Sequence, residues 1–251
     1  MTATADPALP EEFAVEAPPL RGQVSLVQDW TDLAFLHWPV SPEAVVPLLP
    51  PGTRPDVLAG TTYVGLVPFR MKRTRIGRHA PVPWLGGFLE TNVRLYSVDD
   101  EGRHGVVFRS LEAQRLVAVL TARAALRVPY FWARMRAESD GADRVWTTQR
   151  LLGRGRSLIA LRVGEPVEPT FLDTWLTARW GLHTRIGGRT CWLPNAHPPW
   201  PLHAADVVAL DDGLVRRGGV HVAGPPTVPV RWSPGVRTAF GVPVPLGRAP
   251  G

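Results

Sequence analysis

FLETNVRLYSV, residues 88–98, runs through the turn DDEGR into HGVVFRSLEA, residues 104–113, and this stretch decides the fold. Alternation of mostly polar with mostly apolar side chains is the pattern of a strand with two different faces. One face carries Glu90, Asn92, Arg94 and Tyr96. The other face carries Leu89, Thr91, Val93 and Leu95. The acidic and glycine residues between the two segments favour a tight turn, so the stretch predicts an antiparallel hairpin.

The rest of the chain repeats this pattern with few helices. Further strands are predicted at 33–40, 61–71, 128–139, 144–151, 157–163, 182–186 and 189–197. Helices are predicted at 42–47, 114–126 and 171–180. Ser41 before Pro42 is a typical helix start, and Thr170 is a candidate N-cap. The sequence therefore predicts an α+β domain, mainly antiparallel β, with two or three helices, and favours a barrel.

Composition indicates one folded domain inside the cell. The 251 residues are 45% hydrophobic, enough for a sizeable core. Residues 1–22 are expected to form a disordered acidic, Pro-rich tail, and residues 23–245 a single domain with short strands and irregular chain towards its end. The N-terminus has no secretory pattern, no apolar run suits a membrane span, and Cys191 is the only cysteine. A cytoplasmic location is expected.

The positive charge does not predict a nucleic-acid partner. The formal net charge is +6, but Lys72 is the only lysine and the other 27 basic residues are scattered arginines. Only KRTRIGR, residues 72–78, is locally dense, and we interpret it as an exposed basic loop without stacking aromatics. A homo-oligomer is compatible with the sequence, and no residue pattern argues for one.

No cofactor or metal is predicted. The chain lacks the glycine-rich nucleotide motifs and the nucleophile elbow of the hydrolases. Its candidate zinc ligands are His183, Cys191, His197 and His203. Their spacings match no zinc pattern, and prolines interrupt the group.

The polar face of residues 90–96 has two interpretations. In an open sheet it simply meets water. In a small barrel it lines a ligand cavity, where Arg94 and Asn92 bind an organic acid and Glu90, its pKa raised by burial, acts as an acid or base. Tyr130 is a candidate proton donor, with core packing as the alternative.

Weaker candidates for ligand contacts lie on other segments. They are Arg70, Arg109, Arg123, His37 and Trp132. Arg109 and Glu112 fall on opposite faces of a regular strand, so the two cannot both point inward. For the other arginines the alternative is a surface charge, and for His37 it is a satisfied core histidine.

Several motifs occur in an order that resembles the YqjF-like family, bacterial proteins of unknown function related in fold to acetoacetate decarboxylase. They are FLHWPV, SPEAVVPLLPPG, YVGLVPFRM, FLETNVRLY, GVVFRSLEA, VPYFWARM, FLDTWLTARWGL and HPPWPLHAADV. The resemblance covers about residues 28–210 and implies a cone-shaped, largely antiparallel barrel whose interior is a small-molecule pocket.

The resemblance also implies what the site lacks. In the decarboxylases a catalytic glutamate precedes a proline and a lysine pair, and one lysine forms a Schiff base. Glu90 matches the glutamate here, while Tyr130 and Phe131 stand where the lysines would be. Lys72 lies on another segment. Schiff-base decarboxylation is therefore not expected.

Three hypotheses follow. The first is a barrel that binds a small carbonyl or carboxylate compound, with or without lysine-free enolisation, dehydration or cyclisation. The second is a non-catalytic sensing module that uses the same cavity. The third is a protein-interaction domain whose barrel is filled by Phe131, Trp132 and Met135.

Overall fold

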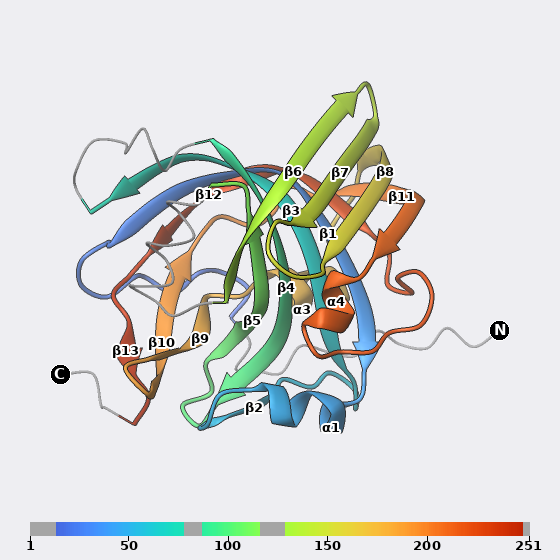
Figure 1. Ribbon diagram of the computed structural model, residues 1–251. Coiled ribbons are helices and arrows are strands. Elements are labelled where there is room, and N and C mark those ends of the chain that lie inside the picture. The colour runs from blue at the N-terminus through green and yellow to red at the C-terminus, as the bar shows by residue number, and fades with distance from the viewer. Residues whose placement is uncertain (1–13, 78–86, 116–128, 248–251) are drawn as a thin grey trace.

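The computed structural model describes residues 14–77, 87–115 and 129–247, most of which lie in one thirteen-stranded sheet (Figure 1). The strands are β1 Leu26–Val40, β2 Thr53–Pro55, β3 Thr62–Ile76, β4 Phe88–Asp99, β5 His104–Ala113, β6 Tyr130–Asp140, β7 Asp143–Arg150, β8 Arg156–Pro166, β9 Gly181–Ile186, β10 Arg189–Ala196, β11 His203–Asp212, β12 Arg231–Phe240 and β13 Val244–Pro245. The helices of this part of the chain are α1 Pro42–Val45, the 3-10 turn η1 Val46–Leu48, α3 Phe171–Thr177 and α4 Leu214–Arg217. The predicted α+β class with mainly antiparallel strands is confirmed.

The sheet closes into a barrel. Strands β1, β3, β4, β5, β9, β10 and β12 pair in a ring, because β4 joins β5 and β10 joins β12 in addition to the main strand order. Neighbouring strands are antiparallel except where β5 meets β6 and β9. The predicted hairpins β4–β5, β6–β7 and β9–β10 are all present.

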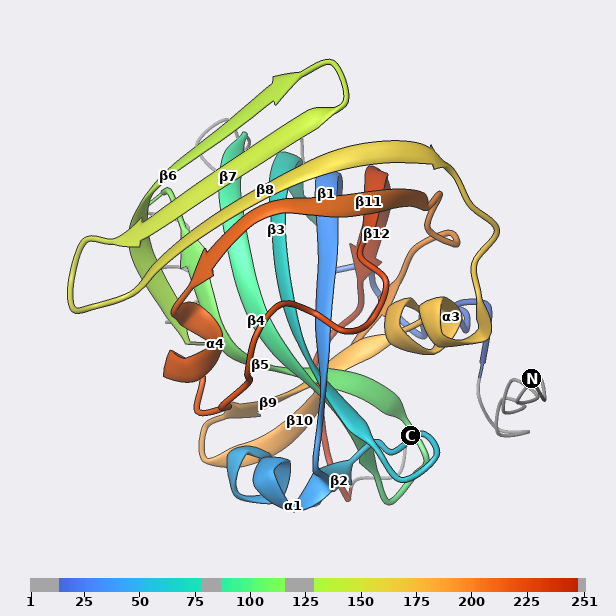
Figure 2. The ribbon, with the colours of Figure 1, turned by 90° about the vertical axis from the view of Figure 1, so that its right-hand side faces the viewer.

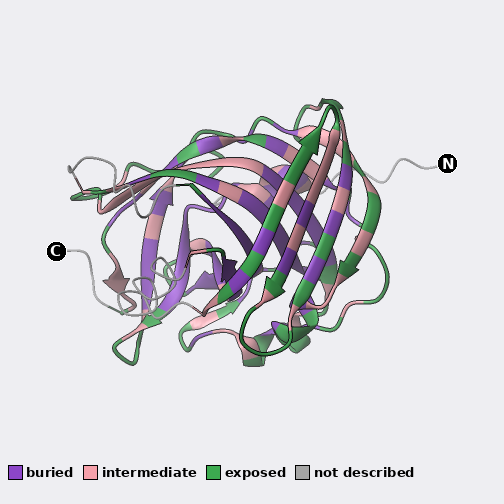
Figure 3. Ribbon diagram, turned by 45° about the horizontal axis from the view of Figure 1, so that its top comes forward, coloured by how far each residue is buried: buried purple, intermediate pink, exposed green. Residues whose placement is uncertain are grey.

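A second layer crosses the outside of the ring. Strands β6, β7, β8 and β11 form an arch that leaves the ring at β5 and rejoins it at β12, passing over β4, β3 and β1 (Figure 2). Along β6 and β8 buried and exposed residues alternate, as expected for strands with one face on the core (Figure 3).

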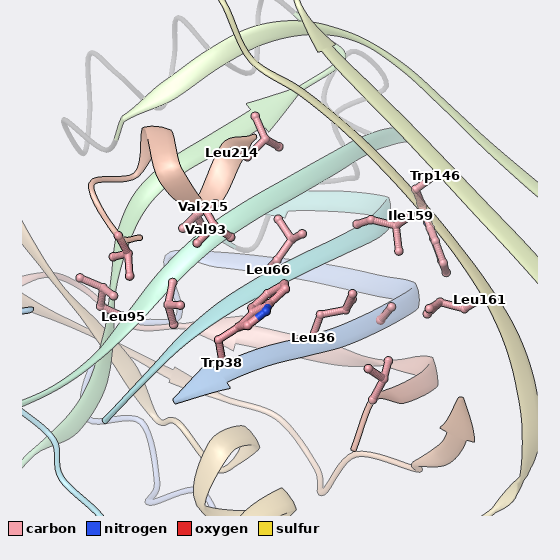
Figure 4. Close-up of a cluster of buried hydrophobic side chains, with 14 of the residues drawn as sticks. Leu36, Trp38, Leu66, Val93, Leu95, Trp146, Ile159, Leu161, Leu214 and Val215 are labelled. Carbon is pink, nitrogen blue, oxygen red and sulfur yellow. The ribbon is translucent and has the colours of Figure 1, made fainter. Parts of the chain in front are cut away.

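The layer between arch and ring is a hydrophobic core. Its ring side includes Leu66 and Val93, and its arch side includes Trp146 and Ile159 (Figure 4). Val93 is fully buried here, so the face of β4 opposite Glu90 is anchored in this core. The polar row of β4 must then point into the barrel, because successive side chains of a strand alternate.

Helix α3 begins and ends where local chemistry dictates. The Thr170 hydroxyl accepts a hydrogen bond from the Asp173 backbone N–H, and the Asp173 carboxylate accepts one from the Thr170 N–H, a reciprocal capping box. The helix stops at Thr177, three residues before the predicted end, because Ala178 leaves helical geometry. This early stop turns Arg179 into the barrel.

Replacing Thr170 with alanine should lower the free energy of unfolding by about 1 kcal/mol, because the first turn of α3 loses its cap. Denaturant unfolding measures the change. Thr174→Ala, the same chemical change inside the helix, is the control and should cost less, because alanine is the better helix former. Equal losses for the two variants would contradict the capping role.

Other sequence-based expectations were wrong in detail. Residues 72–76 belong to β3 rather than to a loop, although Lys72 is exposed. The expected short strands and irregular chain after residue 200 contain two ten-residue strands, β11 and β12, and the unpredicted α4. The predicted helix at 114–126 lies mostly outside the described residues.

The chain from residue 14 onward touches the domain. The Trp180 Nε1–H donates to the Ala14 carbonyl over 2.6 Å, and Ala17 packs on the core around Trp175. The predicted boundary near residue 22 stays a prediction. Among the described residues, no helix has the length and apolarity that a membrane crossing requires.

Candidate functional site

A cavity of about 350 Å³ lies inside the barrel. Its wall is largely apolar and includes side chains from ring strands β1, β3, β4, β5, β9, β10 and β12. The polar exceptions that matter for chemistry are Glu90, Asn92, Arg94, Tyr130, Thr177, Arg179, Asn195 and His197. A mostly apolar cavity with a few convergent polar groups is typical of a small-molecule site.

Strand β4 supplies the polar row. Glu90, Asn92 and Arg94 all line the cavity, as their alternation predicts. Consecutive members stand about 7 Å apart along the strand. Glu90 pairs with Phe69 of β3 near the middle of the cavity, and Arg94 pairs with Gly65 further along.

Glu90 is a buried acid. Its side chain is 3% exposed, and the Tyr130 hydroxyl donates a hydrogen bond of 2.9 Å to its carboxylate. Burial raises the pKa of Glu90 to about 8, with a smaller opposing effect from the Tyr130 hydrogen bond and a smaller reinforcing one from the Glu112 charge. Glu90 is therefore mostly protonated at neutral pH and can donate a hydrogen bond.

Tyr130 reaches Glu90 because β6 begins as a parallel neighbour of β5. Leu111 pairs with Tyr130, and Ala113 of the same strand pairs with Glu90. Burial, with the Glu90 charge and hydrogen bond as lesser causes, raises the pKa of Tyr130 well above its ordinary value. The phenol keeps its proton and serves as a donor.

Arg94 marks the closed end of the cavity, which we define by Arg94, Tyr96, Leu176 and Arg179. The Arg94 guanidinium donates to the Tyr96 hydroxyl over 3.2 Å and to the Leu176 carbonyl over 3.3 Å, and it lies 5.5 Å from the centre of the Phe35 ring. No ion pair joins Arg94 to a carboxylate of the described residues. The opposite end is more open, since Ile76 at the cavity wall is 44% exposed.

A hydrogen-bond network behind Arg94 fixes its position. The Tyr96 hydroxyl accepts from the Arg94 Nε–H, and it lies 3.2 Å from the Leu176 carbonyl oxygen and 2.6 Å from His37 Nε2. Burial, helped by the charges of Arg94 and Arg179, lowers the pKa of His37 well below its ordinary value, so the ring is neutral.

Arg179 adds a second cation at the closed end, and this one is buried. It donates to Asp56 and to the Trp175 carbonyl, and the Asp56 carboxylate also contacts His104 Nδ1 at 2.8 Å. His197 lines the same region with Nδ1 2.8 Å from the Pro198 carbonyl. Burial lowers the pKa of His197 to about 4 against that hydrogen bond, so this ring is neutral too.

The profile of the DUF2071 family, described as an uncharacterized conserved protein, matches residues 27–237. The chain belongs to the DUF2071 family. The uncharacterized protein YqjF of Bacillus subtilis (strain 168) is 32% identical to it over 186 residues, which are 71% of this chain and 75% of YqjF.

Solved structures similar to this DUF2071 protein share its fold at low sequence identity. Acetoacetate decarboxylase from Legionella pneumophila has a TM-score of 0.62 at 12% identity, with 98% of each chain covered. The enduracididine biosynthesis enzyme MppR, in complex with pyruvate, has a TM-score of 0.61 at 12% identity over 90% of this chain and 92% of MppR. An acetoacetate decarboxylase-like enzyme from Sphingomonas wittichii RW1 has a TM-score of 0.61 at 11% identity over 90% of this chain and 94% of that enzyme. The predicted acetoacetate-decarboxylase-like fold is confirmed.

Four of the weaker candidates do not line the cavity of this DUF2071 protein. Arg70 stands between Phe69 and Met71, which do, so its side chain points to the other face of β3. Trp132 is 38% exposed and donates its indole N–H to the Gln114 carbonyl. His37 lies behind Arg94, as a core histidine does. Arg123 lies outside the described residues.

Arg109 is the fourth candidate that does not line the cavity, and a β-bulge in β5 explains why. Val93 pairs with Ser110 and Arg94 pairs with Phe108, so Arg109 is the extra residue. Its guanidinium donates to the Gly218 and Leu48 carbonyls outside the ring. Because the bulge shifts the alternation, Glu112 also points outward, where it binds Arg150 over 2.6 Å. As predicted, the two residues do not both point inward, but they share the outer face because the bulge makes the strand irregular.

Of the described residues 129–135 of the segment VPYFWARM, only Tyr130 lines the cavity. Phe131 lies over the Arg150 guanidinium at 3.6 Å, and Met135 packs with Leu89 in a small outer cluster. Neither these two nor Trp132 lines the cavity. Lys72, exposed on β3, does not line it either, so the described wall offers no amine for an imine.

Sequence reasoning missed four of the polar cavity residues that matter for chemistry, which are Thr177, Arg179, Asn195 and His197. They come from the end of α3 and from β10, which pairs with β12 only through barrel closure. A buried Ser97–His183–Asp99 chain, with contacts of 2.8 and 3.0 Å, resembles a hydrolase triad. Ser97 is fully buried and does not line the cavity, so the chain ties β4 to β9 rather than serving a substrate. The described residues contain no cluster of three or more acidic, His or Cys side chains suited to a metal ion.

Proposed function

We propose that this DUF2071 protein binds a small organic acid that carries a carbonyl group, with the carboxylate at Arg94 and the rest of the molecule in the apolar cavity on the side of Glu90. The observation that carries the proposal is the single strand β4, which directs a buried acid and a guanidinium into one apolar cavity. MppR, which shares the fold, binds pyruvate, an acid of this class.

The charge balance of the closed end supports an anionic ligand. Arg94 and Arg179 are cations there, Asp56 is bonded to Arg179, and His37 and His197 are neutral. One positive charge is left without a bonded carboxylate among these groups. Because hydrogen bonds between a guanidinium and a carboxylate are strong, a ligand carboxylate that hydrogen-bonds to Arg94 gains binding free energy.

The Glu90–Tyr130 pair supports acid–base chemistry without a lysine. Protonated Glu90 can donate to a ligand carbonyl, and ionised Glu90 can accept a proton from the carbon beside that carbonyl. In the second case the C–H bond breaks, the proton moves to Glu90, and the electron pair moves onto the carbonyl oxygen. A donor such as Tyr130 stabilises the resulting enolate. Enolisation is the simplest such reaction, and dehydration or cyclisation would build on it.

Arg94→Gln should weaken the binding of 2-oxo acids by about a hundredfold, because it removes the charge that pairs with the carboxylate. Thermal shift and calorimetry with 2-oxo acids, 3-oxo acids and their hydroxy analogues measure the effect. Arg134→Gln, which removes an exposed arginine from β6, is the matched control and should bind as wild type does. If no acid in the series raises the melting temperature of the wild-type protein, the proposal fails.

Two further measurements distinguish an enzyme from a non-catalytic sensing module and test for imine chemistry. Exchange of the ligand's C–H protons with deuterated water, lost in Glu90→Gln, would support catalysis, whereas binding without exchange would support the sensing module. Borohydride treatment should add no covalent mass, and an adduct would contradict lysine-free chemistry. We place this function in the cytoplasm, where a lone cysteine stays reduced.

A further inference from the structure

The middle of the cavity is surrounded by aromatic rings. We call these the ring belt, and its members are Trp30, Phe35, Phe69, Trp200 and Phe240. Trp30 stacks on Trp200 with centroids 6.3 Å apart, and it lies 5.5 Å from Phe69 and 5.9 Å from Phe240. Phe35 meets Trp200 edge to face at 5.1 Å. Rings from β1, β3 and β12 and from the segment before β11 therefore form one continuous aromatic wall.

The ring belt runs beside the polar row, from Phe69, which pairs with Glu90, to Phe35, which lies 5.5 Å from the Arg94 guanidinium. The inward residues of β4 follow in the order Phe88, Glu90, Asn92 and Arg94. Phe88 pairs with Met71 of β3, and Met71 pairs with Trp30 of β1. Trp30 is thus level with Phe88, and Phe69 is level with Glu90. Arg94 lies about 13 Å beyond Glu90 along the strand. A ligand with its acid group at Arg94 has the rest of its body beside the ring belt, because Phe35 lies 5.5 Å from the Arg94 guanidinium and contacts Trp200.

The cavity is also too large for a three-carbon acid. Its volume is about 350 Å³, and a water molecule occupies about 30 Å³ in the liquid, so there is room for roughly twelve water-sized groups. A three-carbon 2-oxo acid has about six such groups and would leave roughly half of the apolar space unfilled. Filling that space removes more apolar surface from water, which favours binding.

We propose that the ligand is an aromatic 2-oxo acid, held with its carboxylate at Arg94 and its ring inside the ring belt. The assignment rests on the proposed function and adds the ligand's apolar half. Aromatic pairs in tilted or edge-to-face contact gain free energy beyond the area they bury, and the ring belt offers such faces and edges on several sides.

Calorimetry with four compounds tests the assignment on the whole protein. They are phenylpyruvate, pyruvate, phenylacetone (phenylpyruvate with a methyl group in place of the carboxylate) and the eight-carbon straight-chain 2-oxo acid. Phenylpyruvate should bind at least about tenfold more tightly than pyruvate because its ring is buried, and more tightly than the straight-chain acid. It should bind about a hundredfold more tightly than phenylacetone, which cannot pair with Arg94.

Phe69→Leu keeps the wall apolar but removes one ring. It should weaken phenylpyruvate binding about fivefold and leave pyruvate binding unchanged. Phe131→Leu, the same change at a ring outside the cavity, should alter neither, and melting temperatures establish that both variants fold.

The outcomes separate the two proposals. Pyruvate or the straight-chain acid binding as tightly as phenylpyruvate overturns the aromatic assignment and leaves the proposed function standing. Phenylacetone binding as tightly as phenylpyruvate overturns the placement of the carboxylate at Arg94. Absence of binding by all four compounds overturns both.

Discussion

The Glu90→Gln variant is expected to become more stable than the wild-type protein as the pH rises from about 5 to about 8. Burial is the main cause that raises the pKa of Glu90 from 4.5 to about 8 in the folded protein. Between these two values the native state holds a proton that the unfolded chain has lost. The free energy of unfolding of the wild type therefore falls as the pH rises through this window, and the glutamine variant, which cannot titrate, escapes the loss.

The difference in the free energy of unfolding between Glu90→Gln and the wild type should be on the order of 3–5 kcal/mol above about pH 8. It should vanish below about pH 4, where the Glu90 carboxyl is protonated in both the folded and the unfolded state. Denaturant unfolding across this pH range measures it. Glu138→Gln, at an exposed position of β6, is the control and should differ from wild type by a constant amount. A pH-independent difference for Glu90→Gln would show that Glu90 is ionised in the native protein and would remove it as a general acid.

The polar row of β4 was predictable because its determinants are local. Period-two alternation puts Glu90, Asn92 and Arg94 on one face, and the turn that follows fixes the hairpin. The same locality explains the helix start at Ser41 and the cap at Thr170. Which side of the sheet becomes the inside is a different matter, because it depends on the arch that covers the other face of β4.

The errors arose where a non-local or irregular feature decides. The bulge at Arg109 adds one residue to β5, and no alternation pattern announces it. Tyr130 and Trp132 share one face of β6 and both pair with β5, but Trp132 pairs with Ala113, the last residue of β5, and is exposed, so only Tyr130 lines the cavity. Arg179 enters the cavity because α3 ends early, and its partner Asp56 comes from a loop more than a hundred residues away. Such contacts exist only once the barrel has closed.

Asp56→Asn is expected to lower the free energy of unfolding by about 3–5 kcal/mol, because it leaves a buried guanidinium without its carboxylate. The side chains of Arg179 and Asp56 are 3% and 4% exposed. Burial tends to raise the pKa of Asp56, but the Arg179 charge and the contact with His104 outweigh it and lower the pKa below its ordinary value. The carboxylate therefore stabilises the fold above its unfolded-state pKa, and this contribution is lost as the pH falls through the folded-state pKa.

Denaturant unfolding at neutral and acid pH measures the effect, and the penalty of Asp56→Asn should shrink at acid pH. Asp143→Asn is the matched control, since Asp143 pairs with Arg162 in the open, where the two side chains are 49% and 64% exposed, and its loss should change stability little. If both variants unfold alike, the Arg179–Asp56 pair is not a determinant of the fold.

The same substitution also reports on the cavity. Asp56→Asn removes a negative charge from behind the closed end, so the positive potential around Arg94 and Arg179 increases. An organic acid that binds there should bind the folded variant several-fold more tightly, while an uncharged ketone should not respond. Stability and acid affinity would then move in opposite directions in one protein. A general loosening of the barrel cannot produce that combination, because it would weaken both.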